Sequence, residues 1–348
     1  MYMIDNVSNL SFIPTCPMRS RRYFRIAGIT VCVESSLDFS AIQFKPELLS
    51  FAVAGPGEDN VTLRHYFEMP KLVDLDLGQE IYRRPPWVIS NKNGLWYYRG
   101  LLTCREDEVP HKMAVFSDDY RFGVIFSPPR VRRIILNYGW QSLALLPTDQ
   151  IWLAPLVACR EALLLHSAAA IVNGRGFLFV GHSEAGKSTT VELLKTAAIG
   201  GATDKADGFP PFAAALPRKR QQISEPKRRG LELNILCDDR NIVRKWPDSW
   251  RVHGTWSHGS TADVSPADAP LQAIFLLEQS PSNKLIELSD HKLIWQRLLP
   301  TLVRAHVTAQ WWNLELDILQ QLITEIPCYV MRFDKSGAIV PQLERLTR

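Results

Sequence analysis

One stretch decides the fold of this chain: it reads Gly181-His182-Ser183-Glu184-Ala185-Gly186-Lys187-Ser188 and is followed by Thr189. It matches the phosphate-binding pattern G-x-x-x-x-G-K-[ST], the P-loop motif, at every fixed position. The glycines let backbone N–H groups point at phosphate oxygens, Lys187 reaches the outer phosphates, and the Ser188 hydroxyl holds Mg²⁺. Residues 181–189 are therefore predicted to cradle the phosphates of a nucleotide.

The flanking sequence supports the motif. The apolar run Phe177–Val180 precedes it and predicts a buried strand, and a helical pattern with Val191, Leu193 and Leu194 follows. Strand, loop and helix is the order that the motif needs, because the helix N-terminus adds partial positive charge beside the phosphates. This context favours phosphate binding over a chance match in an unrelated turn.

The strand before the motif has a partner immediately upstream. Two apolar runs, 162–172 and 176–180, are joined at Asn173-Gly174, which is a strong signal for a two-residue hairpin turn. Doubly wound nucleotide-binding folds normally enter the motif from a parallel strand without such a partner. The P-loop strand is therefore predicted to be one arm of a hairpin.

Two carboxylates follow further along the chain. Residues 231–243 predict one apolar strand that ends in Asp238 and Asp239. A carboxylate beside a P-loop can hold Mg²⁺, and a second one can accept a proton from an attacking hydroxyl. Adjacent strand residues point to opposite faces, so we expect separate roles: Asp238 for the metal with Ser188, and Asp239 for the proton. The alternative is a surface turn.

Three histidines and a glutamate are further candidates. His166 lies on the hairpin strand, where it is either a core residue or a side chain that approaches the phosphates; both interpretations stay open. His253 and His258 lie in a glycine-containing loop that either lines a substrate cleft or only makes a turn. Glu278 follows a predicted strand, 273–277, and is a candidate metal ligand.

This order of motifs resembles the HPr serine kinase/phosphorylase family, which is related in fold to ATP-dependent phosphoenolpyruvate carboxykinase. The resemblance rests on His166-Ser167-Ala168, the hairpin, the P-loop motif and Asp238-Asp239-Arg240, and it covers roughly residues 160–260. It implies that Lys187 and Ser188 bind ATP and Mg²⁺, that Asp239 takes a proton from a protein serine, and that His166 lies by the phosphates. It also implies a homo-oligomer.

The chain departs from the family pattern in three places. A segment at 199–233, rich in proline, glycine and basic residues, separates the P-loop helix from the carboxylates. The family's Arg-Gly-x-Gly stretch is replaced by Arg251-Val252-His253-Gly254, so its metal-binding glutamate has no match. The N-terminal half does not resemble the family. We therefore expect a divergent member whose substrate need not be HPr; related kinases also act on small precursor peptides in peptide-modification gene clusters.

The chain divides into three predicted parts. Residues 1–22 are expected to be poorly ordered, because they lack periodicity. Residues 23–146 predict a β-rich (α+β) domain with alternation at 29–34, a strand at 61–67, and hairpins at 87–98 and 113–126. Residues 147–348 predict an α/β P-loop domain of the HPr kinase/phosphoenolpyruvate carboxykinase type. Its amphipathic helix at 148–160 is capped by Thr148 or Asp149, and a helix at 311–326 precedes a strand at 329–333.

The amino-acid composition indicates which kinds of partner the chain is expected to have. The 348 residues are 46% hydrophobic and 22% charged, as in soluble proteins, and no apolar run reaches the ~18 residues that span a bilayer. The six cysteines are spread without a C-x-x-C pair, which argues against a zinc site or disulfide framework and for reduced thiols in a cytoplasmic protein. We expect no membrane partner.

The net charge of +4 has one source. Residues 201–230 hold seven positive and three negative side chains, so the rest of the chain is balanced. This balance argues against a nucleic-acid-binding surface. The basic segment is either a solvated loop or a flap that steers an acidic partner.

The leading hypothesis is an ATP- and Mg²⁺-dependent kinase that phosphorylates a serine, or another hydroxyl, on a protein or peptide. Lys187 would neutralise the transferring group and Asp239 would activate the hydroxyl. Two alternatives stay open: a nucleotide-binding regulatory or assembly module without phosphotransfer, and a kinase for a small molecule.

Overall fold

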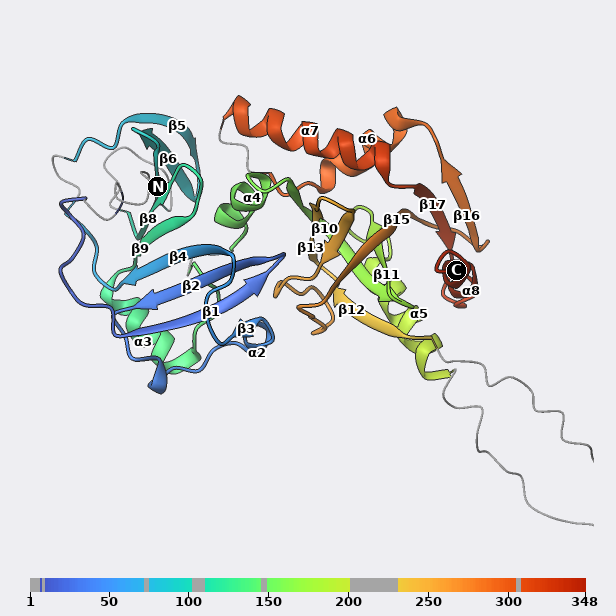
Figure 1. The fold of residues 1–348 in the computed structure, drawn as a ribbon, viewed down its shortest axis with the longest axis horizontal. Coiled ribbons are helices and arrows are strands. Elements are labelled where there is room, and N and C mark those ends of the chain that lie inside the picture. The colour runs from blue at the N-terminus through green and yellow to red at the C-terminus, as the bar shows by residue number, and fades with distance from the viewer. Residues whose placement is uncertain are drawn as a thin grey trace, which may run out of the picture.

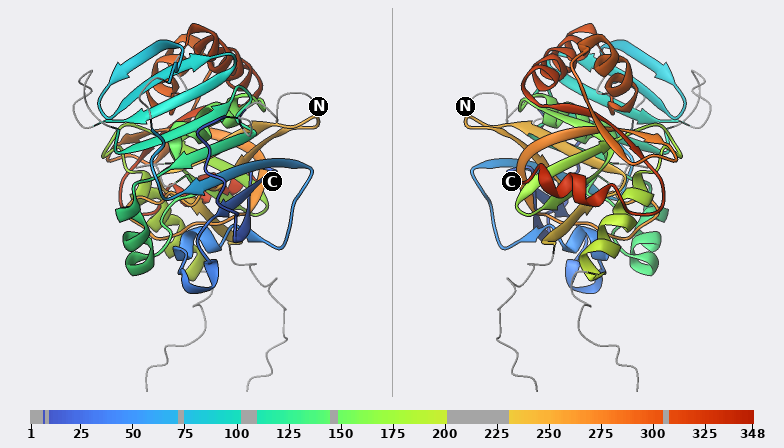
Figure 2. Two further views of the ribbon diagram at one scale, coloured as in Figure 1. Left: turned by 90° about the vertical axis from the view of Figure 1, so that its left-hand side faces the viewer. Right: turned by 90° about the vertical axis from the view of Figure 1, so that its right-hand side faces the viewer.

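The structure, a computed structural model, describes residue 7 and residues 10–71, 75–101, 110–144, 149–200, 231–304 and 308–348. The basic part of the predicted insertion, residues 201–230, lies outside the described residues, as do Thr148 and Cys104. The described residues form two mixed β-sheets, one from each half of the chain, with helix α4 between them (Figure 1). The side views in Figure 2 bring the strands of either half to the front in turn.

The first sheet, called here the N-terminal sheet, has the strand order β3-β1-β2-β4-β9-β8-β7-β6-β5. Its strands are β1 (Ser20–Ile26), β2 (Ile29–Ser35), β3 (Ala52–Val53), β4 (Asp59–Tyr66), β5 (Gln79–Arg84), β6 (Trp87–Lys92), β7 (Leu95–Gly100), β8 (Lys112–Ser117) and β9 (Phe122–Phe126). Both expected hairpins are present, β6–β7 and β8–β9. The first turns at Asn93 and Gly94, which both have positive φ as this turn type requires.

Two details differ from the sequence expectations. All seven residues of β2 are buried, although alternation predicted one exposed face, and buried Glu34 is ion-paired with Arg64 at 2.7 Å. Val7 is fully buried, and the ring of Phe12 lies 5.9 Å from that of Phe126, so part of the segment before β1 packs on the sheet.

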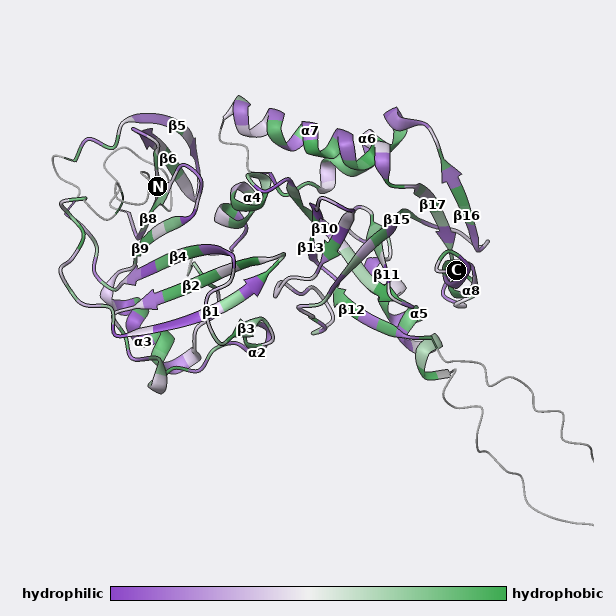
Figure 3. Ribbon diagram, viewed as in Figure 1, coloured by the Kyte–Doolittle hydropathy of each residue, from purple (hydrophilic) through white to green (hydrophobic). Residues whose placement is uncertain are grey.

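Two short helices, η1 (Phe39–Ala41) and α2 (Pro46–Leu49), lie between β2 and β3 of this sheet, and α3 (Pro129–Tyr138) and α4 (Gln150–Ala158) connect its last strand to the rest of the chain. The prediction that α4 is amphipathic was wrong, because every residue from Trp152 to Ala158 is buried. The ribbon coloured by hydropathy in Figure 3 shows α4 between the two sheets. Asp149 does not cap α4 with its side chain. Its carboxylate instead accepts backbone N–H groups of Leu143 and Ala144 and the indoles of Trp152 and Trp256.

The second sheet, called here the C-terminal sheet, has the order β11-β10-β13-β14-β15-β17-β16, with β12 also paired to β10. Its strands are β10 (Ala162–Val172), β11 (Arg175–Val180), β12 (Leu233–Cys237), β13 (Arg240–Lys245), β14 (Trp250–His253), β15 (Asp268–Gln279), β16 (Lys284–Leu288) and β17 (Cys328–Phe333). Its helices are α5 (Lys187–Gly200), α6 (His291–Leu298), η2 (Leu299–Thr301), α7 (Ala309–Glu325) and α8 (Val340–Arg345).

The P-loop strand β11 is one arm of a hairpin, as the sequence predicts. It pairs antiparallel with β10 and parallel with β15. Since β10 also pairs with β13, β13 with β14 and β14 with β15, these five strands close into a circuit. The loop that carries the P-loop motif therefore follows a strand, β11, that is hydrogen-bonded to a neighbouring strand on each side.

The two halves share one hydrophobic cluster. It contains Phe24 and Trp140 from the first half together with Leu164 and Trp256 from the second. Around it, Arg160 forms an ion pair with Asp59, with 2.6 Å between Nε and Oδ2. The halves are therefore held in a fixed relation by apolar packing and charge.

Two observations extend over the described residues of both halves. The described part contains no helix that is both long and apolar enough to cross a membrane. Cys16, Cys32, Cys159, Cys237 and Cys328 are free thiols.

Candidate functional site

The P-loop motif forms a tight loop between β11 and α5. Val180 is the last residue of β11 and Lys187 the first of α5, so residues 181–186 make the whole connection. Gly186 has φ +106°, and a Cβ placed there would lie 2.7 Å from the ring of Phe333. Glycine is thus required at this position both for backbone conformation and for space.

Lys187 lies under this loop. Its Nζ donates to the carbonyl oxygens of Gly181 at 2.9 Å and His182 at 3.2 Å, and the residue is 8% exposed. Burial lowers the pKa of Lys187, although the charges of Asp239 and Asp238 act to raise it. The ammonium is therefore fixed inside the loop and within the field of both carboxylates.

Ser188 and Asp238 come together, although the 201–230 segment separates them in sequence. The Ser188 hydroxyl donates to Oδ2 of Asp238 at 3.2 Å. Asp238 also accepts the backbone N–H groups of Gly259, Ser260 and Thr261 at 2.6, 3.1 and 3.0 Å. Burial opposes ionisation of Asp238, but these hydrogen bonds outweigh it and lower its pKa.

Ser260 is a site residue that sequence reasoning missed. Its hydroxyl donates to Ser188 Oγ at 2.7 Å and lies 3.3 Å from Asp238 Oδ2. Ser260 lies 72 positions from Ser188 and matches no motif, so the sequence holds no signal for it.

The donor set fits a magnesium ion. Two hydroxyl oxygens and a carboxylate are hard oxygen ligands of the kind that Mg²⁺ prefers. No group of three or more His, Cys, Asp or Glu residues gathers within the described ranges, so the protein offers no complete metal cage there. Sites that rely on one carboxylate, water and substrate phosphates are typical of Mg²⁺. The residues that would hold the ion are Ser188 and Asp238, with Ser260 beside them.

Asp238 and Asp239 directly follow the end of β12, as predicted for a strand that ends in two carboxylates, and form the bend before β13. The sequence predicted one strand over 231–243; the structure divides it into β12 and β13, both antiparallel to β10. The pairing brackets the bend, since Cys237 lies opposite Ala169 and Arg240 opposite His166.

Buried polar groups hold this bend. The Cys237 thiol accepts the backbone N–H groups of Asp239 and Arg240 at 3.3 Å each. Burial raises the pKa of Cys237 to about 11, so the thiol stays neutral. The fully buried Asn241 donates to the carbonyl oxygens of Ser167 and Cys237 at 2.8 and 3.2 Å. The bend is therefore fixed by side chains of its own strand and of β10.

Asp239 has three side-chain partners. Its Oδ1 lies 3.1 Å from His166 Nδ1, its Oδ2 accepts the Ser257 hydroxyl at 2.7 Å, and Arg240 also donates to Oδ2. Burial acts to raise the pKa of Asp239, but hydrogen bonds from His166 and Ser257 and the charge of Arg240 lower it overall. The carboxylate is therefore ionised near neutral pH and able to accept a proton.

The structure brings the main candidates together. Asp238 contacts Ser188, and Asp239 contacts His166. The charges of both carboxylates act to raise the pKa of Lys187. His166 thus lies on the Asp239 side of the bend, and its side chain is 39% exposed. The P-loop motif, the Ser188–Asp238 oxygen pair and the ionised Asp239 carboxylate therefore share one region.

Two weaker candidates lie elsewhere. Glu278 accepts hydrogen bonds from Arg297 at 2.5 Å and Arg332 at 3.2 Å, which lower its pKa, so it is an ion-pair residue and not a metal ligand. His253 is 4% exposed and accepts the indole N–H of Trp246 at 3.3 Å, so it does not line the region of Asp239. His258 does lie there, beside a cavity described next.

A cavity of about 310 Å³ opens beside Asp239. Both halves of the chain line it, and its wall consists of Lys45, Gln141, Ser142, Asp149, Gln150, Leu153, Leu164, Asp239, Arg240, Thr255, Trp256, Ser257 and His258. His258 Nε2 lies 3.1 Å from Glu47 Oε1 and 3.3 Å from Lys45 Nζ, which joins the loop after β14 to the N-terminal half.

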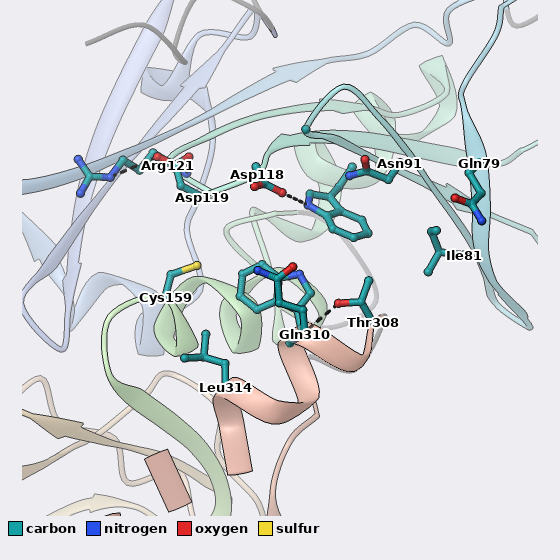
Figure 4. A pocket seen from close by; sticks show the side chains of 13 residues that line it. Gln79, Ile81, Asn91, Asp118, Asp119, Arg121, Cys159, Thr308, Gln310 and Leu314 are labelled. Atoms are coloured by element: carbon teal, nitrogen blue, oxygen red, sulfur yellow. Dashed lines mark hydrogen bonds and ion pairs between the residues drawn. The ribbon is translucent and has the colours of Figure 1, made fainter. Parts of the chain in front are cut away.

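A larger cavity, of about 940 Å³, lies between the N-terminal sheet and α7 (Figure 4). Its carboxylates are already engaged. Asp118 Oδ1 accepts the indole N–H of Trp96 at 2.9 Å, and Asp119 Oδ1 accepts the Ser117 hydroxyl at 2.7 Å. None of its lining residues belongs to the P-loop or to the Asp238–Asp239 bend.

Comparison with known proteins gives little sequence support. No family model matches the chain, and no curated protein matches it. Among solved structures, the Hpr(Ser) kinase/phosphatase from Coxiella burnetii is similar, with 9% sequence identity and a TM-score of 0.25, over 53% of this chain and 88% of that one.

Proposed function

We propose that this chain is an ATP- and Mg²⁺-dependent kinase that transfers the γ-phosphoryl group to a serine or another hydroxyl, with a C-terminal half of the HPr kinase type. One observation carries the proposal. Ser188–Asp238 and His166–Asp239 are adjacent polar pairs at a single bend, and the P-loop Lys187 lies within the field of both. A P-loop alone binds phosphate; the ionised pair beside it supplies the remaining parts of a phosphotransfer site.

In this proposal, different residues bind the phosphates, hold Mg²⁺ and accept the proton. Backbone N–H groups of 181–186 and the Lys187 ammonium bind the phosphates and offset their charge. Ser188 and Asp238 would hold Mg²⁺, which when bound supplies positive charge between the outer phosphates. Asp239 accepts the proton of the attacking hydroxyl, while Ser257 and Arg240 fix its orientation.

His166 contacts Oδ1 of Asp239, whereas Ser257 and Arg240 contact Oδ2. His166 thus helps to hold the carboxylate in place. Since hydrogen bonds lower the pKa of Asp239, it acts by orienting the hydroxyl and taking its proton late in the transfer, not as a strong base.

The test separates binding from transfer. ATP·Mg²⁺ binding is measured by calorimetry on the parent, Lys187→Ala and Asp239→Asn, with Lys195→Ala as a control because Lys195 lies on the same helix and pairs with Asp263. Transfer is followed with radiolabelled ATP and serine-containing peptides. We expect Lys187→Ala to weaken binding at least ~100-fold, because a charge-assisted phosphate contact is lost from a buried site.

Asp239→Asn should bind ATP within about threefold of the parent and lose at least ~1000-fold in transfer. Lys195→Ala should match the parent in both measurements. A fully active Asn variant would remove Asp239 from the mechanism. ATP binding with no transfer to any acceptor would instead favour the nucleotide-binding regulatory module.

A further inference from the structure

The cavity beside Asp239 has a position that the proposed transfer needs. Asp238 faces the Ser188 hydroxyl and the P-loop, whereas Asp239 lines the cavity together with Arg240 and Ser257. An acceptor hydroxyl seated in the cavity is therefore next to the carboxylate that would take its proton. The volume of about 310 Å³ is at the lower limit for ligand pockets, ~300–1,000 Å³, so it fits a group the size of one small metabolite.

Two cationic side chains, Lys45 and Arg240, line the cavity. Arg240 Nε is buried and has no hydrogen-bond partner among the described residues. The Lys45 ammonium lies 3.3 Å from His258 Nε2 and 3.9 Å from Glu47 Oε2, and its side chain is 33% exposed. The unsatisfied Arg240 donor and the partly exposed charge of Lys45 favour a ligand that supplies oxygen acceptors.

The carboxylate of Asp149 does not compete for these donors. Both of its oxygens already accept N–H groups, one from Leu143 and Trp256 and the other from Ala144 and Trp152. Asp149 thus shapes the cavity without presenting a free acceptor. The remaining polar lining, with Gln141, Gln150 and Ser142, is neutral.

The positions of Asp239 and Arg240 in the cavity restrict which ligands fit. Arg240 donates a hydrogen bond to Asp239 and both line the cavity, so the hydroxyl that faces one and the anionic group that faces the other must be close together in the ligand. A hydroxyl one or two carbons from a carboxylate meets this requirement, because an arginine fork matches carboxylate geometry.

We propose that this cavity is the acceptor subsite and takes a small hydroxy acid, with Lys45 of the N-terminal half as its specificity-determining residue. This inference rests on the proposed kinase function. In the transfer, the hydroxyl oxygen forms a bond to Pγ, the bond from Pγ to the β,γ-bridging oxygen breaks with its electron pair left on ADP, and the hydroxyl proton moves to Asp239.

The N-terminal half then has a defined task. Lys45 precedes α2, and its contact with His258 brings a cation from the first half to a cavity that residues of both halves line. Completion of the acceptor subsite needs both halves, which are packed through one cluster.

The experiment uses D-glycerate as the probe, glycerol as the matched compound without a carboxylate, and the full-length protein. Binding of each probe is measured by saturation-transfer NMR and calorimetry without nucleotide; phosphorylation is measured with ATP and Mg²⁺. The variants are Lys45→Met, which keeps an apolar stem without the charge, and Gln141→Trp, which adds bulk at an exposed wall position. Lys71→Met, at an exposed lysine of the same half, is the control.

We expect D-glycerate to bind and glycerol to bind at least ~10-fold more weakly, since a charge-assisted contact to an anion is worth about this factor. Lys45→Met should raise Kd for D-glycerate about 10-fold, Gln141→Trp should abolish binding, and both should keep the parent affinity for ATP. Lys71→Met should match the parent.

Equal binding of the two probes, or a Lys45→Met variant identical to the parent, would overturn the proposal. Phosphorylation of an internal serine in a peptide, with no binding of D-glycerate, would also overturn it while leaving the kinase function intact. Conversely, if ATP fails to bind, the kinase function falls, but D-glycerate binding measured without nucleotide still decides whether the cavity is a hydroxy-acid site.

Discussion

Ser260 shows how much of the site depends on a residue outside any motif. Its hydroxyl contacts both Ser188 and Asp238, and its backbone N–H also points at that carboxylate. Because the side-chain contacts join the two residues that would hold Mg²⁺, Ser260 positions them and need not be a ligand. A residue with this role should change the metal requirement more than the affinity for nucleotide.

Ser260→Ala is predicted to raise the Mg²⁺ concentration for half-maximal activity by about 5- to 10-fold, because the hydrogen bond that orients Ser188 is lost. ATP turnover at saturating Mg²⁺ should fall by less than about threefold. The measurement is turnover against free Mg²⁺. Ser282→Ala, which removes an exposed hydroxyl that contacts only Ser280 among the described residues, is the control and should leave the curve unchanged. An unchanged Ser260→Ala curve would exclude the positioning role.

At the scale of elements, α4 and the segments beside it depend on one buried carboxylate. Asp149 is 8% exposed, and its oxygens accept two backbone N–H groups before α4, one indole on α4 and one on the loop after β14. Burial raises the pKa of Asp149, although these hydrogen bonds act to lower it. The group connects three segments that share the cluster between the sheets.

Asp149→Ala should therefore lower the free energy of unfolding by about 3 kcal/mol, because four buried donors lose their acceptor. Urea unfolding followed by tryptophan fluorescence gives the number. Asp149→Asn retains one acceptor oxygen and should lose about half as much. Asp248→Ala, at an exposed aspartate, should stay within about 0.5 kcal/mol of the parent. A neutral Asp149→Ala variant would contradict this account of the junction.

The elements near the P-loop were predictable because their signals are local. The Asn173-Gly174 turn, the apolar runs on either side and the glycine pattern each act over a few residues. Errors arose where distant parts decide. The predicted cap at Asp149 failed because its carboxylate accepts N–H groups of nearby residues outside the cap positions and the indole N–H of Trp256, 107 positions away. The single strand over 231–243 became two because Asn241 and Cys237 stabilise a bend through contacts that no periodicity reveals.

The same distinction holds for the candidate site. Lys187, Ser188 and the two carboxylates follow from motif chemistry, and the structure places them together. The cavity could not be predicted, because its wall combines Lys45 with residues more than a hundred positions away. Such a meeting depends on how the two sheets pack.

At the scale of the whole molecule, buried histidines couple stability to pH. Burial lowers the pKa of His253 to about 4, with the charges of Arg251 and Arg244 acting in the same direction and Asp268 against it. Burial also lowers the pKa of His65 to about 3. Both side chains are neutral in the folded protein. In the unfolded chain, a histidine binds a proton when the pH is below its ordinary pKa of about 6.5.

The pKa of His253 is lower in the folded than in the unfolded protein. The contribution of neutral His253 to the free energy of unfolding is therefore complete above about pH 6.5 and is lost as the pH falls toward 4. We predict that the parent loses stability between pH 7.5 and 5 and that His253→Gln reduces this loss by about 2 kcal/mol. Urea midpoints at the two pH values give the difference. His291→Gln, at an exposed histidine, should behave as the parent. An equal loss in the parent and His253→Gln would assign the acid sensitivity to other groups.

Asp238 and Asp239 are neighbours in the chain, and this has a mechanical consequence. Consecutive Cα atoms are about 3.8 Å apart whatever the surroundings do. The separation between the Cα atoms of the two residues is therefore set by covalent geometry, and thermal motion of the bend carries both residues together. Substitutions that lower Tm without touching the bend should leave the temperature dependence of the transfer step unchanged until the molecule unfolds.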